Sequence, residues 1–170
     1  MPTAPNVLNY FIGKGTIVFT PSGGSAIDLG NAPEIELTPE IEKLDHFSSR
    51  SGVRSKDRSV VLEKSATLRV VLDEITPYNL SLALLGTVTT NTAGNETFDV
   101  FAESEITGQI VITGTNAVGN QFTVTLPSVS FQPSSGVNFI SDEFGTIEIT
   151  GEVLEVNGSF GTIEQSQVAT

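Results

Sequence analysis

The sequence contains no cysteine and no tryptophan, and it has only one histidine and two tyrosines. Without cysteine the chain can form neither a disulfide framework nor a thiolate zinc site, and it has no thiol nucleophile. Any Ser-His-Asp triad would need His46, yet there is no G-x-S-x-G motif and Asp45 is its neighbour rather than a spaced partner. We therefore expect no enzymatic activity, no metal and no cofactor.

Long apolar runs are also missing. The longest is Leu82–Leu85, far short of the roughly 20 residues that span a bilayer. Residues 1–9 lack the basic start and apolar stretch of a signal peptide. We expect a protein without signal peptide or membrane anchor. No linker is visible, so residues 1–170 are expected to form a single domain with short flexible ends.

Acidic residues are abundant, but their spacing fits no common site. The adjacent pairs Asp73-Glu74 and Asp142-Glu143 lack the D-x-D-x-D-G spacing of a calcium loop, which leaves calcium open without a motif for it. Paired carboxylates on strands, such as Asp99 with Glu103 or Glu148 with Glu152, could act as a glycosidase pair across a cleft. Such a site normally has aromatic platforms for sugar rings, and this chain has no tryptophan. The acids therefore indicate surface electrostatics rather than catalysis.

Positive charge is absent after Arg69. Residues 1–69 contain all eight Lys and Arg and eight Asp and Glu, a net charge of zero, whereas residues 70–170 contain twelve acids and no base, a net charge of −12. Such a skew either keeps an ordinary surface solvated or forms an anionic surface that repels another polyanion such as DNA. Charge alone leaves both interpretations open.

The sequence is rich in period-two alternation. Leu68, Val70 and Leu72 fall on one face of a half-buried strand, with polar residues on the other. The same pattern predicts strands over Thr16–Thr20, Glu34–Thr38, Ser59–Lys64, Thr97–Glu103, Gly108–Thr113, Gln121–Leu126 and Ser128–Gln132. Residues 144–157 change phase, which predicts a bulge or bend near Gly151–Val153. At least eight strands make the chain mainly β.

One short segment breaks the alternation. Thr76 can cap a helix, Pro77 suits its first position, and Gly86 can end it. The residues predicted to share its apolar face are Leu80, Ala83 and Leu84. The pattern predicts one short helix over about residues 77–85 that covers a sheet.

The stretch of about residues 39–59 differs from both patterns. Residues 48–59 contain five serines and four Arg or Lys, which predicts a long polar loop between two strands. Loops of this length in a compact domain are usually functional or disordered. Its bases could contact phosphates, but the acidic chain would oppose nucleic acid. The acidic half of another copy is a better partner, and such head-to-tail contacts build rings or filaments.

The order of these pieces carries a resemblance. Gly13-Lys14-Gly15 enters a strand and is followed by Leu29-Gly30-Asn31, Glu34–Glu40, Glu42–His46 leading into the Arg-Ser loop, the strand pair 59–73 and the leucine-rich helix ending at Gly86. This order, over residues 10–86, resembles the major tail-tube proteins of long-tailed, non-contractile bacteriophages.

The resemblance implies a β-sandwich or half-barrel with one flanking helix, whose copies form hexameric rings with a shared inner β-barrel. Rings would stack head to tail around a tape-measure protein, bounded by tail tip and terminator proteins. The tube would later conduct double-stranded DNA during ejection. The same resemblance implies a location in the virion tail, after assembly in the host cytoplasm, and it implies no membrane partner.

Two groups of residues receive roles from this resemblance. In the family the long loop reaches a neighbouring ring, which assigns inter-ring contacts to Leu44, Asp45, His46, Phe47, Arg50, Arg54, Lys56 and Arg58. An acid-rich lumen would let DNA slide, because DNA binds cationic surfaces through counterion release. The strand acids named as lumen-facing candidates are Asp99, Glu103, Glu148, Glu152 and Glu155. For each of them an outward position facing water is equally open.

Two alternatives to a tail-tube subunit stay open at this point. One is a β-sandwich binding or adhesion module, which should present a cluster of exposed aromatic residues or a calcium site. The other is the tube protein of a contractile injection system, which shares the architecture but need not carry DNA.

Overall fold

The computed structural model describes residues 9–50, 52–116 and 119–166. The ends that the sequence predicts to be flexible, residues 1–8 and 167–170, lie outside the described residues. Within the described residues the chain forms ten strands and one helix. The strands are β1 (Gly13–Pro21), β2 (Ile27–Asp28), β3 (Glu34–Ser48), β4 (Ser55–Leu72), β5 (Thr89–Thr90), β6 (Glu96–Thr97), β7 (Ile106–Asn116), β8 (Gln121–Gln132), β9 (Ile147–Val153) and β10 (Thr162–Ser166), and the helix is α1 (Pro77–Ala83).

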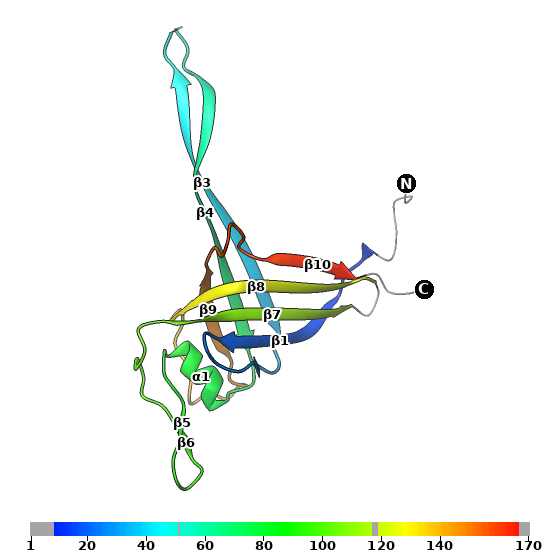
Figure 1. Ribbon diagram of the computed structural model, residues 1–170, viewed down its shortest axis with the longest axis vertical. Coiled ribbons are helices and arrows are strands. Elements are labelled where there is room, and N and C mark those ends of the chain that lie inside the picture. The colour runs from blue at the N-terminus through cyan, green and yellow to red at the C-terminus, as the bar shows by residue number, and fades with distance from the viewer. Residues whose placement is uncertain (1–8, 51, 117–118, 167–170) are drawn as a thin grey trace.

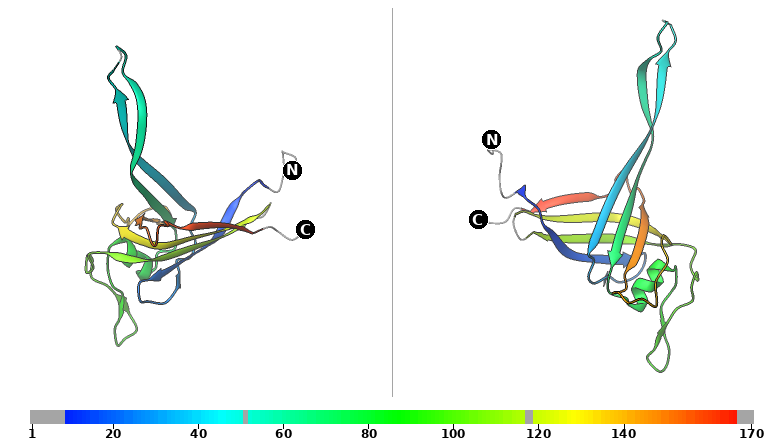
Figure 2. Two further views of the ribbon diagram at one scale, coloured as in Figure 1. Left: turned by 45° about the horizontal axis from the view of Figure 1, so that its top comes forward. Right: turned by 180° about the vertical axis from the view of Figure 1, so that it is seen from behind.

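The strands pair antiparallel in the order β2-β1-β7-β8-β9-β4-β3, and β10 pairs with β8 off this path. A separate small hairpin joins β5 to β6. Figures 1 and 2 show β1, β7 and β8 crossing β3 and β4 at a steep angle, with α1 near the end of the body away from the projecting part of β3 and β4. The mainly β sandwich or half-barrel with one short helix is confirmed.

The sheet turns its corner on β8. The β8–β10 pairing ends at Thr125, and the β8–β9 pairing begins at Val129. Between them the β7 register shifts at Gln109, so that β8 carries an extra residue around Pro127. Proline has no N–H for a ladder bond and is tolerated in strands at such bulges. The two strands predicted over 121–126 and 128–132 are therefore one strand, bent so that its two halves join different neighbours.

The hydrophobic core lies where the two layers cross. Its buried side chains include Ile17, Phe19, Leu68, Val70, Leu72, Ile110, Val129, Phe131, Ile147 and Ile149. The rings of Phe19 and Phe131 meet edge-on, with centroids 5.0 Å apart. Each such side chain contributes about 1.5–3 kcal/mol through burial. The predicted inward set Leu68, Val70 and Leu72 is confirmed by this core.

Helix α1 begins as the sequence predicts. The side-chain oxygen of Thr76 accepts a hydrogen bond from the N–H of Asn79 at 3.1 Å, and Pro77 occupies the first turn. The helix ends at Ala83, two residues earlier than predicted, because Leu85 adopts a left-handed conformation with φ of 51°.

The buried face of α1 differs from the predicted one. Leu82 and Ala83 pack into the core, whereas Leu80 and Leu84 are only half-buried. Asn79 is also buried, and its amide donates to the carbonyl oxygens of Leu29 and Glu74 at 2.9 Å each. The side chain of Asn79 thus takes part of the buried face of α1, which is not made of leucine and alanine side chains alone.

The long loop predicted over residues 39–59 is wrong. Residues 34–48 and 55–72 pair along their length as one antiparallel hairpin. The register shifts at two places, between Glu42 and Lys43 and between His46 and Phe47. Pro39 is accommodated because β3 is the edge strand of the sheet and has no partner on its other side. Serine and charged residues remain extended here because both faces of the projecting ribbon are in water.

The strand predicted over residues 97–103 is also wrong. The N–H of Phe101 donates to Leu84 and that of Glu103 to Leu85, each at 2.9 Å. These N–H groups therefore bond to the carbonyl oxygens of the two residues that follow α1, and not to a neighbouring strand. Phe101 also takes a positive φ of 57°.

Of the predicted bulge or bend near Gly151–Val153, no bulge occurs, because β9 pairs with β4 without a register shift. Ile149, Gly151 and Val153 all face inward in one phase, and β9 simply ends at Val153. A tight turn at Asn157-Gly158, both with positive φ, then leads toward β10. The sequence pattern missed β10 because all five of its residues are exposed.

Candidate assembly surfaces

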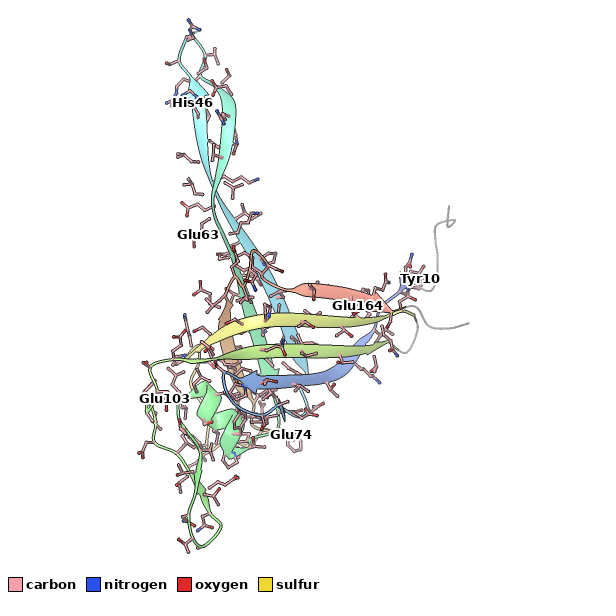
Figure 3. The ribbon with its side chains drawn as sticks, in the orientation of Figure 1. Tyr10, His46, Glu63, Glu74, Glu103 and Glu164 are labelled. Carbon is pink, nitrogen blue, oxygen red and sulfur yellow. The ribbon has the colours of Figure 1, made fainter. Side chains whose placement is uncertain are left out.

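The hairpin of β3 and β4 extends far beyond the body of the molecule (Figure 1). We call residues 40–63 the arm. None of its described side chains is buried. Figure 3 shows His46 toward the far end of the arm and Glu63 nearer the body, whereas Glu103 lies on the opposite side of the sheet, near the helix. The arm contributes nothing to the core, so its sequence is free to serve contacts outside this chain.

Polar contacts within the arm hold its tip in one shape. Lys56 Nζ lies 2.7 Å from a carboxylate oxygen of Asp45, and the hydroxyl of Ser59 donates to the other oxygen at 2.6 Å. The Lys56 bond, followed by the Ser59 bond, lowers the pKa of Asp45 below its usual value. His46 Nδ1 lies 2.6 Å from Asp57.

A cation–π contact also joins the two sides of the tip. The guanidinium of Arg54 lies 5.3 Å from the ring centroid of Phe47. Five of the eight residues predicted to make inter-ring contacts are thus brought together by the arm itself: Asp45, His46, Phe47, Arg54 and Lys56. Among the described residues, the side chains of Arg50 and Arg58 form no ion pair, so their charges remain available to a partner.

The arm also exposes large apolar side chains. Those more than two-fifths exposed are Ile41, Leu44, Phe47, Val53, Val60, Val61 and Leu62. Single exposed apolar residues are ordinary on protein surfaces, but a continuous group marks an interaction surface. Leu44 and Val60 are direct cross-strand partners, so they form one apolar step on the ribbon.

The tip and the rest of the molecule differ in charge. Residues 43–58 contain five Lys and Arg and two Asp and Glu, a net charge of +3. Because the whole chain carries −12, the remainder carries −15. Opposite charges on separate parts of one molecule favour contact between the tip of one copy and the body of another.

A second surface lies on the sheet from which the arm grows. The strand register places alternate residues of β3, β4 and β9 on the face opposite the core. This acidic sheet face carries the seven carboxylates Glu34, Glu36, Glu40, Glu42, Glu63, Glu148 and Glu152 and one base, Arg69. Glu42 and Glu63 are direct cross-strand partners, an arrangement that costs stability through like-charge repulsion.

Arg69 neutralises part of this face. Its guanidinium lies 2.6 Å from Glu148 and 2.8 Å from Glu34, bridging β9, β4 and β3. The Glu148 hydrogen bond is the main cause of a raised pKa for Arg69. Glu36 is the direct cross-strand partner of Arg69 but, like the other four carboxylates, forms no ion pair among the described residues. Seven carboxylates against one arginine leave this face with a strongly negative net charge.

The predicted lumen-facing acids separate into two groups. Glu148 and Glu152 lie on the same outward face of β9, opposite an inward apolar row, as predicted. Asp99, Glu103 and Glu155 lie outside the strands, so their description as strand acids is wrong. Glu103 instead accepts a hydrogen bond from the hydroxyl of Thr87 at 2.6 Å.

Sequence reasoning missed the glutamates of β3, because it divided the chain at Arg69 into a neutral and an acidic part. The signal was present in the alternation of Glu34, Glu36, Glu40 and Glu42 with apolar residues. Their position beside Glu148 follows only from the pairing of β3 with β4 and of β4 with β9.

Two general findings concern the chemistry of these surfaces. Over residues 9–50, 52–116 and 119–166, no three His, Asp or Glu side chains are grouped so that they could hold a metal ion. In the same part of the chain, no helix has the length and apolar character needed to cross a membrane. The arm and the acidic sheet face are thus open, charged surfaces.

The fold and these two surfaces define an antiparallel β protein that presents a long hairpin arm and an acidic sheet face. Residues 10–112 match the family described as "Protein of unknown function UCP028589". This match spans more than half of the chain, and the protein belongs to that family. The matched region runs from before β1 into β7 and includes the whole arm and α1. No curated protein matches the chain.

Proposed function

We propose that this chain is a structural subunit of a bacteriophage tail tube. Its copies form hexameric rings that stack head to tail, and the resulting lumen conducts double-stranded DNA during ejection. The observation that carries the proposal is the arm, a projecting hairpin none of whose described side chains is buried in its own chain.

An arm of this kind gains its stability from a partner. Ordering each residue costs about 1–2 kcal/mol of backbone entropy, and the arm recovers little of this through burial in its own chain. Its exposed apolar residues and the unpaired cations of its tip fit a neighbouring copy whose body is anionic. Because arm and receiving surface are different parts of the molecule, the contact propagates instead of closing.

The acidic sheet face supports the second half of the proposal. Double-stranded DNA carries one negative charge per roughly 1.7 Å and adheres to cationic surfaces. A lumen lined by this face, with seven carboxylates and one arginine, would repel DNA and let it pass. The proposed tube therefore turns Glu148, Glu152 and the β3 glutamates inward, around a tape-measure protein and between tip and terminator proteins.

Removing the arm tests the proposal. A variant in which Asn-Gly replaces residues 43–62 joins the cross-strand partners Glu42 and Glu63 through a tight hairpin turn. None of the described side chains that it removes is buried. The variant should therefore keep the fold and the thermal midpoint of the parent chain, as measured by circular dichroism, which serves as the folding control.

We expect the truncated variant to stay monomeric in sedimentation velocity at concentrations where the parent chain forms rings or tubes in negative-stain micrographs. Normal tubes from the truncated variant would remove the proposed role of the arm. A parent chain that never assembles would remove the tube itself.

A further inference from the structure

An apolar groove of about 260 Å³ opens at the root of the arm. We call it the root groove. Its walls come from the β3–β4 ribbon on one side and from β8 and the segment leading into β10 on the other, and they include Leu37, Ile41, Lys64, Val124, Phe160 and Ile163. Ile41 and Ile163 are 56% and 65% exposed, so the described residues leave the groove uncovered.

An exposed apolar loop lies at the other end of the same strands. Within the segment between β8 and β9, Phe139, Ile140 and Phe144 are 73%, 98% and 99% exposed. No residue in the described part of the chain covers Ile140 or Phe144. We call residues 139–144 the apolar loop.

The groove and the loop lie too far apart to meet within one molecule. Lys64 lines the groove, and Leu72, eight residues further along β4, pairs with Ile147 directly beyond the loop. Eight strand residues span about 26 Å. A contact between groove and loop therefore joins two copies head to tail, and it leaves a free groove at one end and a free loop at the other.

Charge favours a copy of this chain as the occupant. Lys64 borders the groove and forms no ion pair within the described residues. Asp142 and Glu143 stand between the exposed side chains of Ile140 and Phe144, so they would reach the rim when those side chains enter. Glu40 also borders the groove. Because Glu40 repels the two carboxylates of the loop, they are directed toward Lys64.

We propose that the root groove of one copy receives the apolar loop of the next copy. This inference rests on the proposed tube and names the contact that stacks its subunits. The copy that inserts its loop then lies above the root of the receiving copy's arm. At strand spacing this arm is about 26 Å long from Glu42 to Arg50. It therefore extends alongside the body of the copy that inserts its loop.

Engineered cysteines test this contact without interference, because the chain has none of its own. Ile163→Cys places a thiol in the groove and Ile140→Cys places one in the loop, both at exposed positions that leave the core intact. Mild oxidation of the assembled double variant should give a ladder of dimers, trimers and longer covalent chains on a non-reducing gel. Each single variant, the matched control, can give dimers only.

The outcomes separate the contact from the tube. A ladder together with tubes in micrographs supports both. Tubes of the reduced double variant that give no ladder on oxidation overturn the groove contact and leave the tube standing. A ladder from Ile163→Cys with Leu44→Cys in place of Ile140→Cys would put the arm in the groove and overturn the loop as its occupant. A parent chain that never assembles overturns both.

Discussion

Reversing two charges at the arm tip is expected to weaken assembly without affecting the fold. Arg50 and Arg58 are exposed and form no ion pair within the described residues, unlike Lys56, which lies 2.7 Å from Asp45. In an Arg50→Glu/Arg58→Glu variant, each substitution removes one positive charge and adds one negative charge. The net charge of residues 43–58 therefore changes from +3 to −1, and the tip repels a body that carries −15.

The size of the effect follows from the exposure of these side chains. A solvent-exposed ion pair contributes about 0.2–1 kcal/mol. Two attractions replaced by two repulsions then cost about 1–4 kcal/mol, which is roughly a 5- to 700-fold loss in the association constant. Salt screens the interaction, since the Debye length shortens from about 10 Å at 0.1 M to about 3 Å at 1 M. The difference between variant and parent should shrink accordingly.

Sedimentation velocity over a concentration series, at low and at high salt, measures this loss. The matched control compares Arg58→Glu with Lys14→Glu, because Lys14 is equally exposed and unpaired within the described residues but lies on β1, away from the arm. Assembly of the double variant at the parent's concentration would refute the role of tip charge. So would an equal loss from Lys14→Glu, which would reduce the effect to net charge.

Three further predictions concern the body and the arm. A Cβ at Gly151 would lie 2.5 Å from Val129 Cγ1, so Gly151→Ala should cost about 1–3 kcal/mol and lower the thermal midpoint; an unchanged midpoint would contradict the close approach. Asn79→Ala should cost about 1–3 kcal/mol in urea denaturation, since the carbonyls of Leu29 and Glu74 lose their donor, the first of them in a buried bond, and a neutral result would mean that water replaces the amide. Lys56 lowers the pKa of Asp45 below its usual 3.8, so this ion pair should persist as pH falls through the usual range and break only when pH falls through the lowered pKa. An NMR titration of Asp45 measures this, and Lys56→Gln should return the pKa toward 3.8 unless the lysine bond is unimportant.

The sequence predicted those elements whose pattern records burial. Leu68, Val70 and Leu72 alternate because one face of β4 packs in the core, and Thr76 with Pro77 marks the start of α1 because capping is local. The arm was missed because both of its faces are in water, so no apolar row distinguishes a strand from a polar loop. The exposed strand β10 was missed for the same reason.

The candidate surfaces were predictable only in part. The Arg and Lys residues of the arm tip were identified from their charge as a contact surface, although the sequence predicted a loop there and not a hairpin. The acidic sheet face depends on register between strands far apart in the sequence, which places Glu34 and Glu148 on either side of Arg69. The charge division at Arg69 is consequently not a division in space, since the arm tip is basic while β3 at its root is acidic.

The most direct test of the account is negative-stain electron microscopy of the unmodified chain over a concentration series. The account predicts a monomer in dilute solution and, above a threshold concentration, rings and stacked tubes with an open lumen. A chain that remains monomeric at every concentration, or that stops at a closed dimer, would contradict it.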